Sequence, residues 1–185
     1  MSGLAAPPGS WPDVPACYGW LSLDRRGRWR LREEVVRHPG LLAYLGMNYG
    51  ADEAGHWLVH NGPQRVYVEL DYTPWVWRLG ADGSLTAHTG GDGGYPTAAF
   101  VDEDGVVLLQ SVLGVGVLDD RDLALFLGAC RGCGGEPATE AELFDLVAGA
   151  ASAAASVFWN ALPLQPVRRE EVGARFGFVA RPVAP

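Results

Sequence analysis

The sequence of 185 residues contains no lysine, and its positive side chains other than histidine are fourteen arginines. A P-loop nucleotide site and a Schiff base with pyridoxal phosphate both require a lysine, so these mechanisms are excluded. Arginine cannot replace lysine as a general base, because the guanidinium group stays protonated at any working pH. The missing lysines therefore remove several classes of enzyme.

Cysteine is also scarce: Cys17, Cys130 and Cys133 are too few for a disulfide scaffold. Cys130 and Cys133 have the spacing of redox and zinc motifs, but no second pair of ligands lies nearby in the sequence. The pair also follows a helical stretch, whereas a reactive pair opens a helix. We expect two incidental thiols at a helix end and leave a redox or metal role open.

Long apolar runs are absent as well. The best candidate, residues 143–159, is interrupted by Asp145 and Gly149 and falls short of the about 20 residues that span a bilayer. The start, MSGLAAPPGSWPDVP, has neither the basic region nor the apolar core of a signal peptide. These features predict a cytoplasmic protein that binds no membrane.

The second half of the chain in particular has few positive side chains. Residues 81–185 carry six arginines and fourteen acidic residues, a net charge of −8. Nucleic-acid binding needs clustered positive charge, so we expect no nucleic-acid partner.

What is present is a regular pattern of strands and helices. Hydrophobic residues make up 48% and aromatic residues 10%, enough for a packed core. The pattern predicts an α+β protein built from two related units, each an antiparallel hairpin with a helix. Residues 1–17 are expected to form an extended arm, residues 18–79 a first β-β-α-β-β repeat, and residues 80–185 a second, divergent repeat.

Three short matches support the repeat. The Asp24–Gly27 turn matches Asp102–Gly105 at an offset of 78 residues, and the helical stretch Leu41–Gly46 matches Leu123–Gly128 at an offset of 82. Arg175–Val179 resembles the strand that begins at Arg65, at an offset of 110. The alternative is a chance similarity of common hairpins.

The second half also contains an added helix. Thr139 and Glu142 form a capping box, and an Ala-rich helix is expected over residues 139–160.

Motifs that would carry catalysis are not apparent. His56 and His60 bracket a strand and would lie about 13 Å apart, too far to share a metal ion. The loop Gly90–Gly94 lacks the lysine and the following helix of a phosphate cradle. The acidic residues of Asp119–Asp122 are explained by capping of the following helix. We therefore predict no catalytic residue, metal or cofactor.

Arginines on the first hairpin form the sharpest polar feature. Arg28, Arg30 and Arg32 alternate along one strand face, and Arg25 and Arg26 precede them. One interpretation is a solvated face neutralised by neighbouring glutamates. The other is a bidentate site for a carboxylate, a phosphate, or the acidic turn 102–104 of this chain or of a second copy.

Seven tryptophans are a high count for this length. Most are expected in the core, because large aromatic side chains gain most from burial. Trp75 and Trp77 share one strand face and form the alternative candidate contacts, lining an apolar ligand pocket.

The segments 23–29, 52–58 and 66–75 together resemble a known family. They read LDRRGRW, DEAGHWL and VYVELDYTPW, and the order of elements is similar over residues 20–79 to that of small proteobacterial proteins of unknown function. The resemblance implies a two-domain α+β fold with a repeated motif and a suggested role in signal transduction. It defines no catalytic residue, and the second half departs from the family pattern.

These observations favour a non-enzymatic regulatory or protein-interaction module that binds a small ligand between its repeats. One alternative is an enzyme whose acids and histidines assemble in the cleft between the repeats. Another is a structural homo-oligomer.

Overall fold

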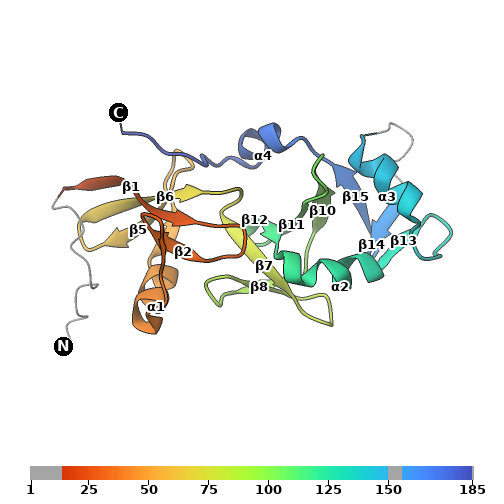
Figure 1. The fold of residues 1–185 in the computed structure, drawn as a ribbon, viewed down its shortest axis with the longest axis horizontal. Coiled ribbons are helices and arrows are strands. Elements are labelled where there is room, and N and C mark those ends of the chain that lie inside the picture. Colours follow the sequence, from red (N-terminus) through yellow and green to blue (C-terminus); the bar gives the residue numbers. More distant parts are fainter. Residues whose placement is uncertain (1–13, 150–155, 185) are drawn as a thin grey trace.

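The computed structural model describes residues 14–149 and 156–184. Within them the chain is mostly β-sheet with four α-helices, which confirms the α+β class (Figure 1). No helix in these ranges is long and apolar enough to cross a membrane. Strand β1 begins at Ala16, inside the expected arm of residues 1–17, and the first thirteen residues lie outside the described part.

The first sheet has six strands in the order β3-β2-β1-β6-β5-β4. The central pair, β1 and β6, is parallel and the other neighbours are antiparallel. Helix α1 connects β3 to β4, and Pro39 at its start suits the first helical turn. The elements are β1 (Ala16–Leu23), β2 (Trp29–Leu31), β3 (Glu34–Val35), α1 (Pro39–Met47), β4 (Tyr49–Ala51), β5 (Trp57–Asn61) and β6 (Gln64–Leu70).

The second sheet has nine strands in the order β13-β14-β15-β10-β11-β12-β7-β8-β9. Its strands are β7 (Trp75–Leu79), β8 (Leu85–Ala87), β9 (Asp92–Gly94), β10 (Ala98–Val101), β11 (Val107–Ser111), β12 (Gly114–Leu118), β13 (Cys130–Gly132), β14 (Val157–Trp159) and β15 (Leu162–Pro166). The first unit was expected to extend to residue 79, but β7 is hydrogen-bonded to β12 of this second sheet. The glycine-rich loop is likewise partly a strand, β9, paired with β8.

Six strands of the second sheet follow the same order as the first sheet. The order β12-β11-β10-β15-β14-β13 again has a parallel central pair, β10 with β15, and antiparallel neighbours. A helix, α2 (Leu123–Gly128), again follows the third strand, after the 3-10 turn η1 (Asp120–Asp122). Two of the hairpins close alike, with glycines at φ +72° (Gly27) and +77° (Gly105).

Two expectations for the second half are wrong. Helix α3 covers only Glu140–Val147, and β14 occupies residues 157–159, where the long Ala-rich helix was expected to continue. The capping box does open α3, and residues 150–155 lie outside the described part. The stretch from Arg175 was expected to be a strand, but helix α4 (Arg169–Phe176) includes its first two residues. In the strand order of the second sheet, the strand that corresponds to β6 is β15.

The second sheet is buried on both faces, because one of its faces packs against the first sheet and α4 and the other face belongs to a separate core. Phe100 of β10 and Leu108 of β11 point into a core shared with the first sheet and α4, while their neighbours Ala99 and Leu109 point into a second core. This division follows from the alternation of side chains along a strand. After α4 the chain returns to the first sheet, where His56 bridges Val179 (Figure 1).

Candidate functional site

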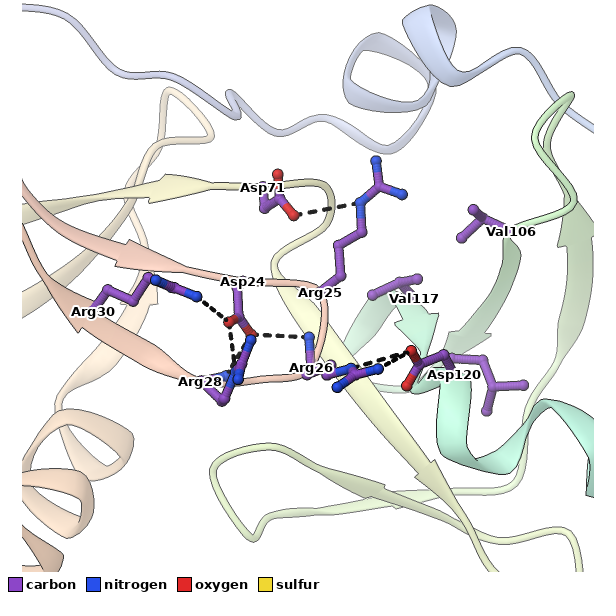
Figure 2. Close-up of a pocket in the computed structure, with 10 residues that line it drawn as sticks. Asp24, Arg25, Arg26, Arg28, Arg30, Asp71, Val106, Val117 and Asp120 are labelled. Atoms are coloured by element: carbon purple, nitrogen blue, oxygen red, sulfur yellow. Dashed lines mark hydrogen bonds and ion pairs between the residues drawn. The ribbon is translucent and has the colours of Figure 1, made fainter. Parts of the chain in front are cut away.

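The β1–β2 hairpin borders a pocket of about 390 Å³ at the junction of the two sheets (Figure 2). One wall comes from the first half and the other from the second half. The lining residues are Asp24, Arg25, Arg26, Arg28, Arg30, Asp71, Val106, Val117, Leu118 and Asp120. We call this space the junction pocket.

Asp24 organises the hairpin. Its Oδ1 accepts hydrogen bonds from the backbone N–H groups of Arg26 and Arg28, both at 3.0 Å. Its Oδ2 accepts from Arg28 Nε at 2.7 Å and lies 3.4 Å from a terminal nitrogen of Arg30. Partial burial works to raise the pKa of Asp24, but the hydrogen bonds from Arg28 and Arg26 outweigh it and lower the pKa. The ionised carboxylate therefore holds Arg28 and Arg30 on one side of the hairpin.

Arg26 joins the two halves, because its Nε and one terminal nitrogen donate to Oδ2 of Asp120 at 3.1 and 2.6 Å. Arg25 lies on the other side of the turn, with its Nε 3.4 Å from Oδ2 of Asp71. Among the described residues, no hydrogen-bond acceptor contacts the terminal nitrogens of Arg25 or Arg28. Figure 2 shows those of Arg25 pointing away from Asp71. Two guanidinium groups thus keep donors available at the junction pocket.

The predicted arginine stripe is only partly brought together. Arg28 and Arg30 line the junction pocket, whereas Arg32 does not. Arg32 has φ +55° in the β2–β3 turn, which breaks the alternation of the strand, and its guanidinium lies 3.8 Å from the centroid of the Trp20 ring. The stripe therefore ends after two residues.

The acidic partner of the hairpin within the chain also differs from the expected one. The turn 102–104 does not meet the hairpin: Asp104 pairs with Arg169 at 3.5 Å, and Glu103 accepts from the Arg169 N–H at 2.9 Å. Asp120 takes the role at the hairpin instead. No local pattern points to Asp120, because its partner lies 94 residues away in the sequence.

Trp75 and Trp77 stack on each other with ring centroids 5.9 Å apart, but neither lines the junction pocket. Trp77 is fully buried, and its indole N–H donates to the Leu109 carbonyl at 2.9 Å. Trp75 is half-buried, and its N–H donates to the Leu113 carbonyl at 2.8 Å. Their contacts are those of packing residues.

His88 packs against the turn of the hairpin, and no role was predicted for it from the sequence. Its ring packs against those of Trp29, Tyr49 and Trp75. A Cβ at Gly27 would lie 2.5 Å from the Cβ of His88, so the hairpin turn and His88 are in close contact. Burial lowers the pKa of His88 from 6.5 to about 3. The imidazole is therefore neutral at neutral pH.

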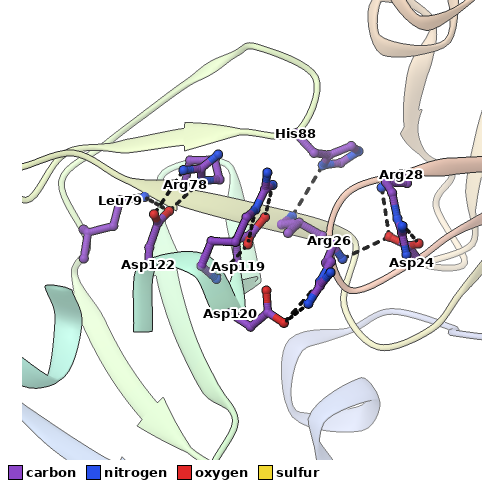
Figure 3. Close-up of polar contacts among 11 residues, drawn as sticks. Asp24, Arg26, Arg28, Arg78, Leu79, His88, Asp119, Asp120 and Asp122 are labelled. Atoms are coloured by element: carbon purple, nitrogen blue, oxygen red, sulfur yellow. Dashed lines mark hydrogen bonds and ion pairs between the residues drawn. The ribbon is translucent and has the colours of Figure 1, made fainter. Parts of the chain in front are cut away.

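The acidic residues that precede α2 serve the fold (Figure 3). Asp119 caps the 3-10 turn through the Arg121 N–H. The expected cap of the following helix is not formed: Asp122, at the N-cap of α2, makes no side-chain cap hydrogen bond and instead accepts from Arg78 Nε at 2.6 Å and from the Leu79 N–H at 3.0 Å. In the part of the chain that the structure describes, no group of three histidine, cysteine or acidic side chains is arranged to hold a metal ion.

The fold and the junction pocket define an α+β protein with an arginine-lined groove between two sheets. The chain belongs to the family DUF2944, described as "Protein of unknown function (DUF2946)", whose model matches residues 6–183. No curated protein matches the sequence significantly.

Two solved structures of DUF1285 family proteins are similar to this chain, each at 12% sequence identity. The protein from Silicibacter pomeroyi DSS-3 has a TM-score of 0.49, with 63% of this chain and 71% of that chain covered. The protein from Shewanella baltica OS155 has a TM-score of 0.40, with 58% and 90% covered.

Proposed function

We propose that the protein is a non-enzymatic regulatory module that binds a small molecule through a carboxylate or phosphate group in the junction pocket. The observation that carries the proposal is that Arg25 and Arg28, on opposite sides of the turn, each have terminal nitrogens that lack a protein acceptor among the described residues. Planar guanidinium groups bind such oxyanions through two parallel hydrogen bonds.

The other lining residues support a ligand with an apolar part. Val106, Val117 and Leu118 come from the second half and add apolar surface beside the arginines. In small-molecule sites, apolar walls bury part of the ligand while polar groups fix its orientation.

The position between two similar sheets supports a regulatory role. We propose that the two halves are copies of one six-stranded unit, because their strand orders and central parallel pairs agree. A ligand at the junction contacts both copies beside the Arg26–Asp120 ion pair. It would therefore stabilise one arrangement of the copies over others, which is how a ligand transmits a signal.

The test is a titration with butyrate and, separately, with inorganic phosphate, followed by proton–nitrogen NMR spectra that include the arginine Nε–H signals. The signals of Arg25 and Arg28 should shift, and Arg25→Gln or Arg28→Gln should weaken binding about tenfold. Arg37→Gln removes an exposed arginine outside the pocket and is the matched control. If neither probe shifts these signals, or if all three variants behave alike, the proposed anion site is wrong.

A further inference from the structure

Arg26 and Asp120, which both line the junction pocket, form an ion pair between the two halves of the chain (Figure 3). The Nε and one terminal nitrogen of Arg26 donate to the same oxygen of Asp120, Oδ2, at 3.1 and 2.6 Å. Among the ion pairs of the described residues, this pair alone joins residues 14–70 to residues 75–184. The contact therefore belongs both to the pocket and to the connection between the sheets.

The ion pair is open to solvent, with 52% of the Arg26 side chain and 56% of the Asp120 side chain exposed. Exposed ion pairs contribute little to stability, because water screens the attraction and two side chains must be held in one geometry. A guanidinium binds a carboxylate best through two parallel hydrogen bonds to its two oxygens, whereas Asp120 offers Arg26 only Oδ2. A free carboxylate or phosphate in the pocket can therefore compete with Asp120 for this arginine.

Asp120 can leave its arginine without disturbing the turn that carries it. The flanking Asp119 is fully buried, and its backbone N–H donates to the Trp77 carbonyl at 2.9 Å. On the other side, Asp122 accepts from Arg78 Nε at 2.6 Å. The Asp120 side chain itself has no hydrogen bond or ion pair among the described residues beyond those to its arginine. The turn therefore stays anchored when this one carboxylate is displaced.

From these observations we propose that Asp120 is an autoinhibitory competitor of the ligand: it holds Arg26 until the ligand's carboxylate or phosphate takes its place. The inference rests on the proposed function and adds the regulation of the same site. Arg26 then contributes to binding the anion, and the ion pair between the halves is lost. The coupling is reciprocal, because the factor by which Asp120 weakens ligand binding is also the factor by which the ligand weakens the ion pair. Ligand binding is thereby converted into a change at the contact between the sheets.

Titration of the full chain with inorganic phosphate and with butyrate, in about 0.15 M salt, tests this proposal. The Nε–H signal of Arg26 should shift when phosphate is added. Asp120→Asn should strengthen binding about two- to fivefold, which is the contribution of an exposed ion pair expressed as an affinity. Arg26→Gln should weaken binding about threefold or more. Glu53→Gln removes an exposed carboxylate outside the pocket and should leave the affinity unchanged.

A double-mutant cycle separates displacement from a simple loss of negative charge. In the Arg26→Gln protein, Asp120 has no guanidinium to compete for, so a further Asp120→Asn substitution should no longer strengthen binding. If negative charge alone repels the probe, Asp120→Asn strengthens binding by at least the same factor in both backgrounds. That result would overturn the autoinhibitory role.

The outcomes distinguish the two proposals. If the probes bind the parent protein but Asp120→Asn leaves the affinity unchanged, Asp120 is not a competitor and the anion site stands. The same conclusion follows if the Arg26 signal stays in place while those of Arg25 or Arg28 shift. If neither probe shifts any arginine signal of the parent protein, the anion site itself is overturned.

Discussion

The Tyr72 hydroxyl donates a hydrogen bond of 2.8 Å to Oδ2 of Asp102, and both side chains are buried, with 6% and 1% of their surface exposed. Oδ1 of the same carboxylate accepts the backbone N–H groups of Asp104 and Val106. Asp102 thus forms the β10–β11 turn in the way that Asp24 forms the β1–β2 turn. The difference lies in the second oxygen, which binds Arg28 in the first turn and Tyr72 in the second. The linker between the sheets is thereby fastened to the second half.

Tyr72→Phe should therefore destabilise the protein by about 1–3 kcal/mol, because it removes a donor from a buried carboxylate oxygen. The free energy of unfolding, measured by urea titration, checks this value. Tyr95→Phe, at a tyrosine with 63% of its surface exposed, should change the free energy by less than about 0.5 kcal/mol. Equal effects of the two substitutions would show that the Tyr72–Asp102 bond contributes nothing.

Gly27→Ala and Gly105→Ala form a matched pair in equivalent turns. Both glycines have positive φ, +72° and +77°, so alanine costs about 1–2 kcal/mol at either position. A Cβ at Gly105 meets nothing within 4 Å, whereas one at Gly27 lies 2.5 Å from the Cβ of His88. Gly27→Ala should therefore cost about 1–3 kcal/mol more, measured in the same urea titration. A larger loss for Gly105→Ala would contradict the close contact of His88 with the turn.

The parts of the fold that the sequence predicts are those with local signals. The hairpin at Asp24, helix α1 and the hairpin at Asp102 all show alternation or helical spacing bounded by turn residues. Strand β15 was missed because its sequence, LPLQP, contains two prolines, which argue against a strand. Helix α4 was missed because Gly173 lies in its interior and lowers its helix propensity, and because Arg175–Val179 was matched to the strand that begins at Arg65.

Only the part of the candidate site that the β1–β2 hairpin contributes could be predicted from the sequence. Arg28 and Arg30 follow from the alternation along β2. Asp120, Val117 and Leu118 reach the same pocket through the packing of two sheets, and no spacing within the chain encodes that contact.

The three cysteines should differ in reactivity. Cys133 is exposed, whereas Cys17 and Cys130 are 2% and 1% exposed, and burial raises the pKa of Cys130 to about 11. Because the thiolate is the reactive form, only Cys133 should react rapidly with a maleimide in the native protein. Mass spectrometry should find one modified thiol, and none in Cys133→Ser. Rapid labelling of Cys130 in the native protein would instead support a redox role for Cys130 and Cys133.

His88 should make the protein less stable as the pH falls. The Val76 N–H donates to Nδ1 of His88 at 3.4 Å, and Nε2 is buried without a partner among the described residues. A second proton on the ring would place a donor against that N–H and a charge among three aromatic rings. Burial accordingly lowers the pKa of His88 from 6.5 to about 3 in the folded protein.

The unfolded chain therefore takes up a proton at His88 as the pH falls below 6.5, and the folded chain does not until the pH approaches about 3. Stability is lost across this window, by at most about 1.4 kcal/mol for each pH unit. Asp24, Asp119 and Asp122 have pKa values below their ordinary 3.8, so the stability that they contribute is fully present above about pH 4.5 and changes little with pH there. Between pH 6.5 and about 4.5, the parent protein should lose roughly 2 kcal/mol that His88→Gln does not lose. Urea titrations at both pH values measure the difference, and parallel losses in the two proteins would show that His88 titrates normally in the fold.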